Sequence, residues 1–137
     1  MNISSKCEYG ARAVLELARR STDSQPVSAA QIATVQAIPE KYLVHILLQL
    51  KHAGLVQSVR GAHGGYRLAK PAEQISLRDV VLAIDGPSLD PLPVKDDAAP
   101  ELKAVWHQAG SAIDALLAAT SIRDIVEDGR NANMYYI

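Results

Sequence analysis

The sequence predicts a mainly helical protein that contains one small β-hairpin. In several segments, apolar residues recur at spacings of three and four, which is the pattern of amphipathic helices. Two short β-like segments flank a cluster of glycines, as the strands of a hairpin do. The 137 residues are 48% hydrophobic and 21% charged, which excludes disordered and low-complexity polymers.

Two helices and a loop are predicted in the first 36 residues. Residues 6–20 carry apolar side chains along one face and predict the first helix. Residues 21–26 are polar and end in proline, so they predict a loop. Ser28 is a good N-cap for a short second helix that extends to about Val35, and Ile32 and Val35 are expected to face inward.

The third helix and the hairpin follow. Residues 39–53 predict a helix with Pro39 in its first turn and Gly54 as its stop. Its expected apolar stripe consists of Leu43, Ile46, Leu47 and Leu50. Residues 55–60 and 66–69 predict two short strands, and the glycines between them supply the permissive backbone that a turn needs.

The second half of the chain predicts fewer elements. Ser76 caps a fourth helix over residues 77–84. A linker rich in proline and aspartate follows over residues 86–99. Residues 100–119 predict a long helix, 122–127 a final short helix, and 128–137 a tail without a clear period. The expected organisation is therefore a domain over residues 1–85, the linker over 86–99, and a C-terminal unit over 100–137.

The net charge of −1 hides a division along the chain. Residues 1–71 contain nine Lys and Arg against four Asp and Glu, whereas residues 72–137 contain five against eleven. The first half is therefore +5 and the second −6, which indicates that the first half binds an anion. An incidental fluctuation of surface charge is the alternative.

Three helices followed by a hairpin, all in the basic half, is the element order of a winged helix-turn-helix. In that motif the third helix lies in the major groove of DNA and presents polar side chains on its outer side. The candidate DNA-binding residues of this helix are Glu40, Lys41, Tyr42, His45, Gln49 and His52. The alternative is an ordinary solvated helix face. His45 and His52 lie seven residues apart and could share a metal, but no third ligand is near in the sequence.

The turn of the hairpin combines two arginines and a histidine with three glycines. Arginine is the side chain that enters a narrow minor groove, and glycine lets a backbone approach a surface closely. The candidate DNA-binding residues of this predicted wing are Arg60, Gly61, His63, Gly64, Gly65 and Arg67. The alternative is a flexible surface turn with incidental arginines.

The chain resembles the Rrf-two family of transcription regulators, which includes an iron–sulfur cluster regulator and a nitric-oxide-sensitive repressor. The resemblance covers nearly the whole chain and is carried by Ile3-Ser4-Ser5-Lys6, Tyr9-Gly10-Ala11, Tyr42-Leu43, Leu50-Lys51, Ala53-Gly54-Leu55-Val56, Ser58-Val59-Arg60-Gly61, Gly64-Gly65-Tyr66-Arg67-Leu68-Ala69, Ile75-Ser76-Leu77-Arg78-Asp79-Val80-Val81, Ile84-Asp85-Gly86, Trp106 and Thr120-Ser121-Ile122-Arg123-Asp124-Ile125-Val126. It implies a homodimeric DNA-binding regulator, expected to be a repressor, whose long helix crosses that of a second copy. The alternative is a winged-helix protein-interaction module that no longer binds DNA.

The long helix carries an apolar face that one short domain does not need at its edge. Together with the resemblance, this face predicts a dimer interface made of Leu102, Val105, Trp106, Ala109, Ile113 and Leu116. A ligand that stacks on Trp106 is the alternative role for that residue.

Family members that hold an iron–sulfur cluster carry three cysteines just before the long helix, whereas residues 86–100 contain none here. A cluster needs about four thiolate or imidazole ligands, so we expect no cofactor and no metal. The single cysteine, Cys7, forms no intrachain disulfide. It is either a small buried residue or a candidate sensor thiol.

Other classes of protein are not supported. No nucleotide-binding or zinc-binding motif is present and no constellation indicates an enzyme. No apolar segment is long enough to span a bilayer, and the charged N-terminal segment is not a secretory signal. We therefore expect a cytoplasmic protein whose partners are duplex DNA, a second copy of the chain, and a small-molecule or protein effector.

Overall fold

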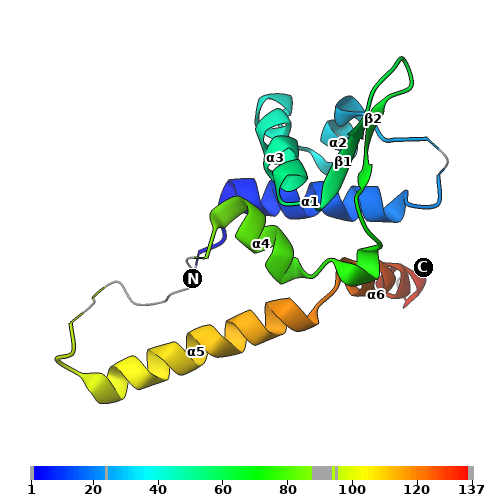
Figure 1. Ribbon diagram of the computed structural model, residues 1–137. Coiled ribbons are helices and arrows are strands. Elements are labelled where there is room, and N and C mark those ends of the chain that lie inside the picture. The colour runs from blue at the N-terminus through cyan, green and yellow to red at the C-terminus, as the bar shows by residue number, and fades with distance from the viewer. Residues whose placement is uncertain (1, 24, 88–93, 95, 136–137) are drawn as a thin grey trace.

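The computed structural model in Figure 1 describes residues 2–23, 25–87, 94 and 96–135, and for residues 130–135 the backbone alone. The predicted fold class is confirmed, because the described chain is mainly helical and contains one antiparallel hairpin. The elements in chain order are α1 (Ser5–Arg19), α2 (Ala29–Gln36), α3 (Glu40–His52), β1 (Val56–Val59), β2 (Gly65–Leu68), the 3₁₀ turn η1 (Ala72–Gln74), α4 (Leu77–Asp85), α5 (Pro100–Ala119) and α6 (Ile122–Tyr135).

Local capping explains where α2 begins and ends. The Ser28 hydroxyl accepts from the backbone N–H of Gln31, and the Gln31 side chain accepts from the backbone N–H of Ser28. At the other end, Ala37 adopts a left-handed conformation with φ of 54°, which stops the helix.

Two expectations about α2 and α3 were wrong. Pro39 precedes α3 as its N-cap rather than lying in its first turn, and Val35 is 53% exposed, since α2 buries only Ile32 and Ala33.

The wing consists of β1, β2 and the turn between them. Val56 lies opposite Leu68 and Val59 opposite Gly65 in the antiparallel register. The wing is fastened to the segment before α2 by two backbone hydrogen bonds between Val27 and Tyr66, of 2.9 and 2.8 Å. The position of the wing is therefore set by the helix-turn-helix itself.

The main core joins α1, α2, α3 and α4 with the base of the wing. Its completely buried members include Val14, Ile32, Leu43, Ile46, Leu47, Leu50, Ile75 and Val80.

Ile122 and Val126 of α6 also belong to this core. The C-terminal unit expected over residues 100–137 is therefore divided, because α6 returns to pack against α1 and η1. The structure also extends α6 to Tyr135, so the final helix is longer than the expected residues 122–127 and includes most of the expected tail.

A second, smaller cluster joins α5 to the rest of the molecule. Cys7, Val81 and Leu117 are its buried members. An ion pair of 2.7 Å between Arg78 and Asp114 ties α4 to α5. Beyond this joint α5 extends away from the body, on the side of α1 opposite to α3 and the tip of the wing (Figure 1).

None of the described helices is long and apolar enough to cross a membrane. The expected linker over 86–99 includes residues 88–93 and 95, which lie outside the described residues.

Candidate nucleic-acid interface

The outer face of α3 (Lys41, Val44, His45, Leu48 and His52) lies opposite its buried stripe. These five residues recur at spacings of three and four and are all exposed, so they form one surface row. The four leucine and isoleucine side chains of the stripe are completely buried, which fixes the rotation of the helix. The row therefore faces solvent and offers two imidazoles and one ammonium group.

The other predicted residues of α3 flank this row. Glu40 is exposed at the start of the helix. Tyr42 is 44% exposed, and the Lys41 ammonium lies 5.1 Å from the centre of its ring. Gln49 is half-buried, and its side-chain Oε1 is buried without a hydrogen-bond partner among the described residues. Lys41 and His45 therefore occupy the outer face, whereas Tyr42 and Gln49 share one flank.

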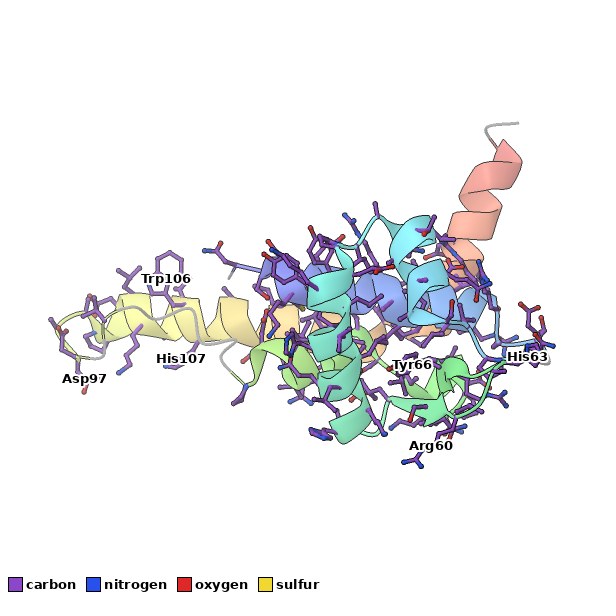
Figure 2. The ribbon with its side chains drawn as sticks, turned by 90° about the horizontal axis from the view of Figure 1, so that it is seen from above. Arg60, His63, Tyr66, Asp97, Trp106 and His107 are labelled. Atoms are coloured by element: carbon purple, nitrogen blue, oxygen red, sulfur yellow. The ribbon has the colours of Figure 1, made fainter. Side chains whose placement is uncertain are left out.

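The wing presents its charged side chains to solvent. Arg60, His63 and Arg67 are exposed, and Figure 2 shows Arg60 and His63 at the outer edge of the wing, with Tyr66 on its inner side. Gly61 is also exposed and has a φ of 116°, a conformation that favours glycine. The wing therefore offers guanidinium and imidazole groups along an edge that no described element covers.

Gly64 and Gly65 each lie close to a backbone carbonyl group of the protein itself. A Cβ at Gly64 would lie 2.2 Å from the carbonyl oxygen of Val59, and one at Gly65 would lie 2.4 Å from that of Val27. Both glycines are therefore required for the close approach of backbone to backbone inside the protein. That the glycines of the turn also let the backbone approach a DNA surface stays a prediction.

A buried carboxylate supports the helix-turn-helix at its contact with α1, and no local pattern in the sequence predicts it. Glu16 of α1 is 4% exposed. Its Oε1 accepts from the Gln36 side-chain amide at 3.0 Å, and its Oε2 accepts from the Arg20 guanidinium at 2.7 Å. The Arg12 guanidinium donates to the backbone carbonyl of Gln36 at 3.2 Å. Together these contacts hold the last residue of α2 against α1, directly before the turn into α3.

Cys7 is a buried residue at the joint between the body and α5. Its side chain is 2% exposed and packs with Val81 and Leu117. Burial and, to a lesser extent, the nearby carboxylate of Asp85 together raise the pKa of the thiol to about 12. The thiolate is the reactive form of cysteine. Because these surroundings disfavour the thiolate, they fit the role of a small buried residue better than that of a sensor thiol. Among the described residues, no three His, Cys, Asp or Glu side chains are grouped to hold a metal ion.

Most of the predicted interface on α5 is exposed in the single chain. The fractional exposures are 49% for Leu102, 54% for Val105, 46% for Trp106 and 66% for Leu116. Ala109 is also exposed, whereas Ile113 is half-buried against the cluster around Cys7. Trp106 and His107 project from different sides of the helix (Figure 2). The structure thus leaves an unpartnered apolar face along α5 that no other described element covers, made of Leu102, Val105, Trp106, Ala109 and Leu116, with Ile113 at its inner edge.

Comparison with known proteins decides the family. A family model described as "Rrf2: Iron-dependent Transcriptional regulator" matches residues 3–128. The chain belongs to the Rrf2 family. It is 34% identical to the HTH-type transcriptional regulator CymR of Bacillus subtilis over 140 residues, which span all of both chains. The Rrf2 family is the Rrf-two family that the sequence resembles, so that prediction is confirmed at the level of the family.

Two solved structures share the fold. The structure of B. subtilis CymR, described as the global cysteine regulator, superposes with a TM-score of 0.85 at 32% identity, covering 93% of this chain and 97% of CymR. The structure of T. potens IscR gives a TM-score of 0.82 at 33% identity, covering 99% and 97% of the two chains. This Rrf2 protein is therefore a winged helix-turn-helix, DNA-binding transcriptional regulator and not an enzyme.

Proposed function

We propose that this Rrf2 protein is a homodimeric, sequence-specific repressor that works without an iron–sulfur cluster. The observation that carries the proposal is that the protein has two different surfaces on opposite sides of α1. The outer face of α3 and the tip of the wing lie on one side of α1, and the unpartnered apolar face of α5 lies on the other (Figure 1). One side of the molecule is thereby suited to DNA and the other to a second copy.

On the DNA side, α3 enters the major groove and the wing contacts the adjacent backbone or minor groove. Lys41 and His45 reach phosphates or base edges from the outer face of α3, with Glu40, Tyr42 and Gln49 beside them. Arg60, His63 and Arg67 make the contacts of the wing, and Gly61, Gly64 and Gly65 shape its turn. Exposed cations on both elements fit a polyanion, as does the +5 charge of residues 1–71.

On the other side, a second copy covers the apolar face of α5. Leu102, Val105, Trp106 and Leu116 are each close to half exposed or more in the single chain, and soluble monomers rarely leave such a contiguous face open. Ala109 and Ile113 complete the interface. A closed twofold pair places two α3 helices on half-sites about 34 Å apart, one turn of DNA.

The test of this function begins with selection of binding sites from a pool of random duplexes. A gel shift then compares the selected duplex with one of scrambled sequence. A regulator retains the selected duplex preferentially, and the preference is centred on two related half-sites. An interaction module that no longer binds DNA recovers no sequence. Repression is tested separately, by placing the selected site in a reporter promoter in bacterial cytoplasm and measuring whether expression falls.

Replacing Arg60 should weaken binding to the selected duplex. We expect Arg60→Ala to cost about 1–3 kcal/mol of binding free energy, because a guanidinium in a groove makes charge-assisted contacts that alanine cannot make. Fluorescence anisotropy of labelled duplex measures the loss. Glu73→Ala, in an exposed position on η1, is the matched control and should bind like the parent. Parental affinity in Arg60→Ala would remove the wing from the interface.

The absence of a cluster rests on the ligands that the chain offers. Residues 86–100 contain no cysteine, and a dimer brings only two Cys7 thiols. Each is buried with a raised pKa. A cluster that bridges two subunits through Cys7 and His107 would need mixed ligation and two close N-terminal helices. Cys7 is buried at one joint, whereas His107 is exposed on α5, so these residues do not fit a cluster. The signal is then a small molecule or a partner protein.

Anaerobic purification tests this point. The isolated protein should contain far less than one iron and one sulfide per chain and should show no visible absorption, because it lacks the thiolates. Stoichiometric iron and sulfide with a broad sulfur-to-iron charge-transfer band would refute the proposal. In that case, loss of the band in Cys7→Ala would identify the ligand.

A further inference from the structure

Two large apolar side chains are exposed on the outer face of α3. Val44 is 59% exposed and Leu48 is 49% exposed, and both stand outside the buried stripe of the helix. They are four residues apart, so they lie next to each other on one helical face. The fold does not need them there, because the core of this helix is already complete without them.

The surroundings of this apolar pair indicate what covers it. Lys41 lies three residues before Val44, His45 lies three residues before Leu48, and His52 lies four residues beyond Leu48. All three side chains are exposed. Glu40 is the one acidic residue of α3. An apolar pair framed by basic side chains fits a surface that is anionic overall and apolar at particular points.

The major groove of duplex DNA is such a surface. Its edges carry hydrogen-bonding groups and phosphates, and its apolar feature is the 5-methyl group of thymine. Apolar side chains on a recognition helix contact that methyl group directly. A valine and a leucine four residues apart can reach methyl groups on neighbouring base pairs.

From this arrangement we propose that Val44 and Leu48 read thymine methyl groups and thereby determine part of the operator sequence. The proposal rests on the proposed function, since it takes α3 to lie in the major groove. It adds a specificity that polar contacts do not provide. The half-site contains thymine at the positions facing these two residues, and the polar neighbours read or anchor the positions around them.

The test uses the duplex recovered by selection, with thymines replaced one at a time by deoxyuridine. This change removes the methyl group and leaves base pairing intact. The parent should lose about fourfold in affinity for each methyl group that is fully buried against an aliphatic side chain. In Val44→Ala or Leu48→Ala the thymine duplex should bind more weakly, and the difference between thymine and deoxyuridine at the matching position should disappear.

Two controls distinguish thymine recognition by Val44 and Leu48 from general effects of an alanine substitution or of deoxyuridine. Val35→Ala changes an exposed apolar residue of α2 and should keep the full preference for thymine. Deoxyuridine placed outside the selected half-sites should have no effect. If the parent binds every deoxyuridine duplex as it binds the thymine duplex, or if both variants keep the preference, the proposal is overturned while DNA binding stands. Failure to select any duplex would instead refute the proposed function.

Discussion

Trp106→Asp combined with Leu116→Asp should convert the protein to a monomer that binds its selected duplex at least about 100-fold more weakly. The two side chains are 46% and 66% exposed on the apolar face of α5. Each carboxylate would have to be desolvated at the interface, which is strongly unfavourable. Without the dimer, each monomer binds one half-site alone. The gain in affinity from linked binding of two half-sites, typically about 10²–10⁴-fold, is then lost.

Sedimentation at micromolar concentration measures the mass, and anisotropy measures the affinity. Ser111→Asp is the matched control, because Ser111 is exposed on the same helix outside the apolar face. It should remain a dimer with parental affinity. A double variant that sediments as a dimer would place the interface elsewhere on the chain.

Gly65→Ala should lower the free energy of unfolding by about 3–5 kcal/mol and detach the wing. The new Cβ would stand 2.4 Å from the carbonyl oxygen of Val27, which is backbone and has little room to move. Overpacking of this kind costs about 1–3 kcal/mol. The two hydrogen bonds between Val27 and Tyr66 would be lost as well, at about 1 kcal/mol each.

Denaturant unfolding followed by circular dichroism measures the stability. Gly61→Ala is the comparison, since a Cβ there meets open space and only the backbone conformation, with φ of 116°, is unfavourable. It should cost about 1–2 kcal/mol, the usual penalty for a left-handed alanine. Equal stabilities of the two variants would show that β2 does not depend on the close approach to Val27.

Much of the fold could be predicted from local patterns. Periodicity located α1, α3 and α5, and the cap residues Ser28 and Ser76 marked where α2 and α4 begin. The return of α6 could not be predicted, because among the side chains that the structure describes it buries only Ile122 and Val126 in the main core, too few to show a period. Val35 was misplaced for a similar reason. An eight-residue helix with two buried residues gives little indication of its inner face.

The exposure of the candidate DNA-binding residues could be predicted only in part. Lys41, His45, Arg60 and Arg67 are exposed as expected. Gln49 lies on a flank of α3 and its side-chain Oε1 is buried. The buried stripe sets the rotation of α3 about its axis, and the sequence shows that rotation only approximately. The contact between Glu16 and Gln36 joins residues twenty positions apart, and no local pattern announces it.

The most direct test of sequence-specific DNA binding is how the affinity for the selected duplex depends on salt concentration. Anisotropy titrations over a range of salt concentrations should give a logarithm of the association constant that falls linearly with the logarithm of the salt concentration. The slope is about −0.9 for each phosphate contacted, and several contacts are expected from a dimer with two α3 helices and two wings. The selected duplex should bind more tightly than the scrambled one at every salt concentration. Equal affinity for both duplexes, or an affinity that does not change with salt concentration, would contradict sequence-specific DNA binding by this protein.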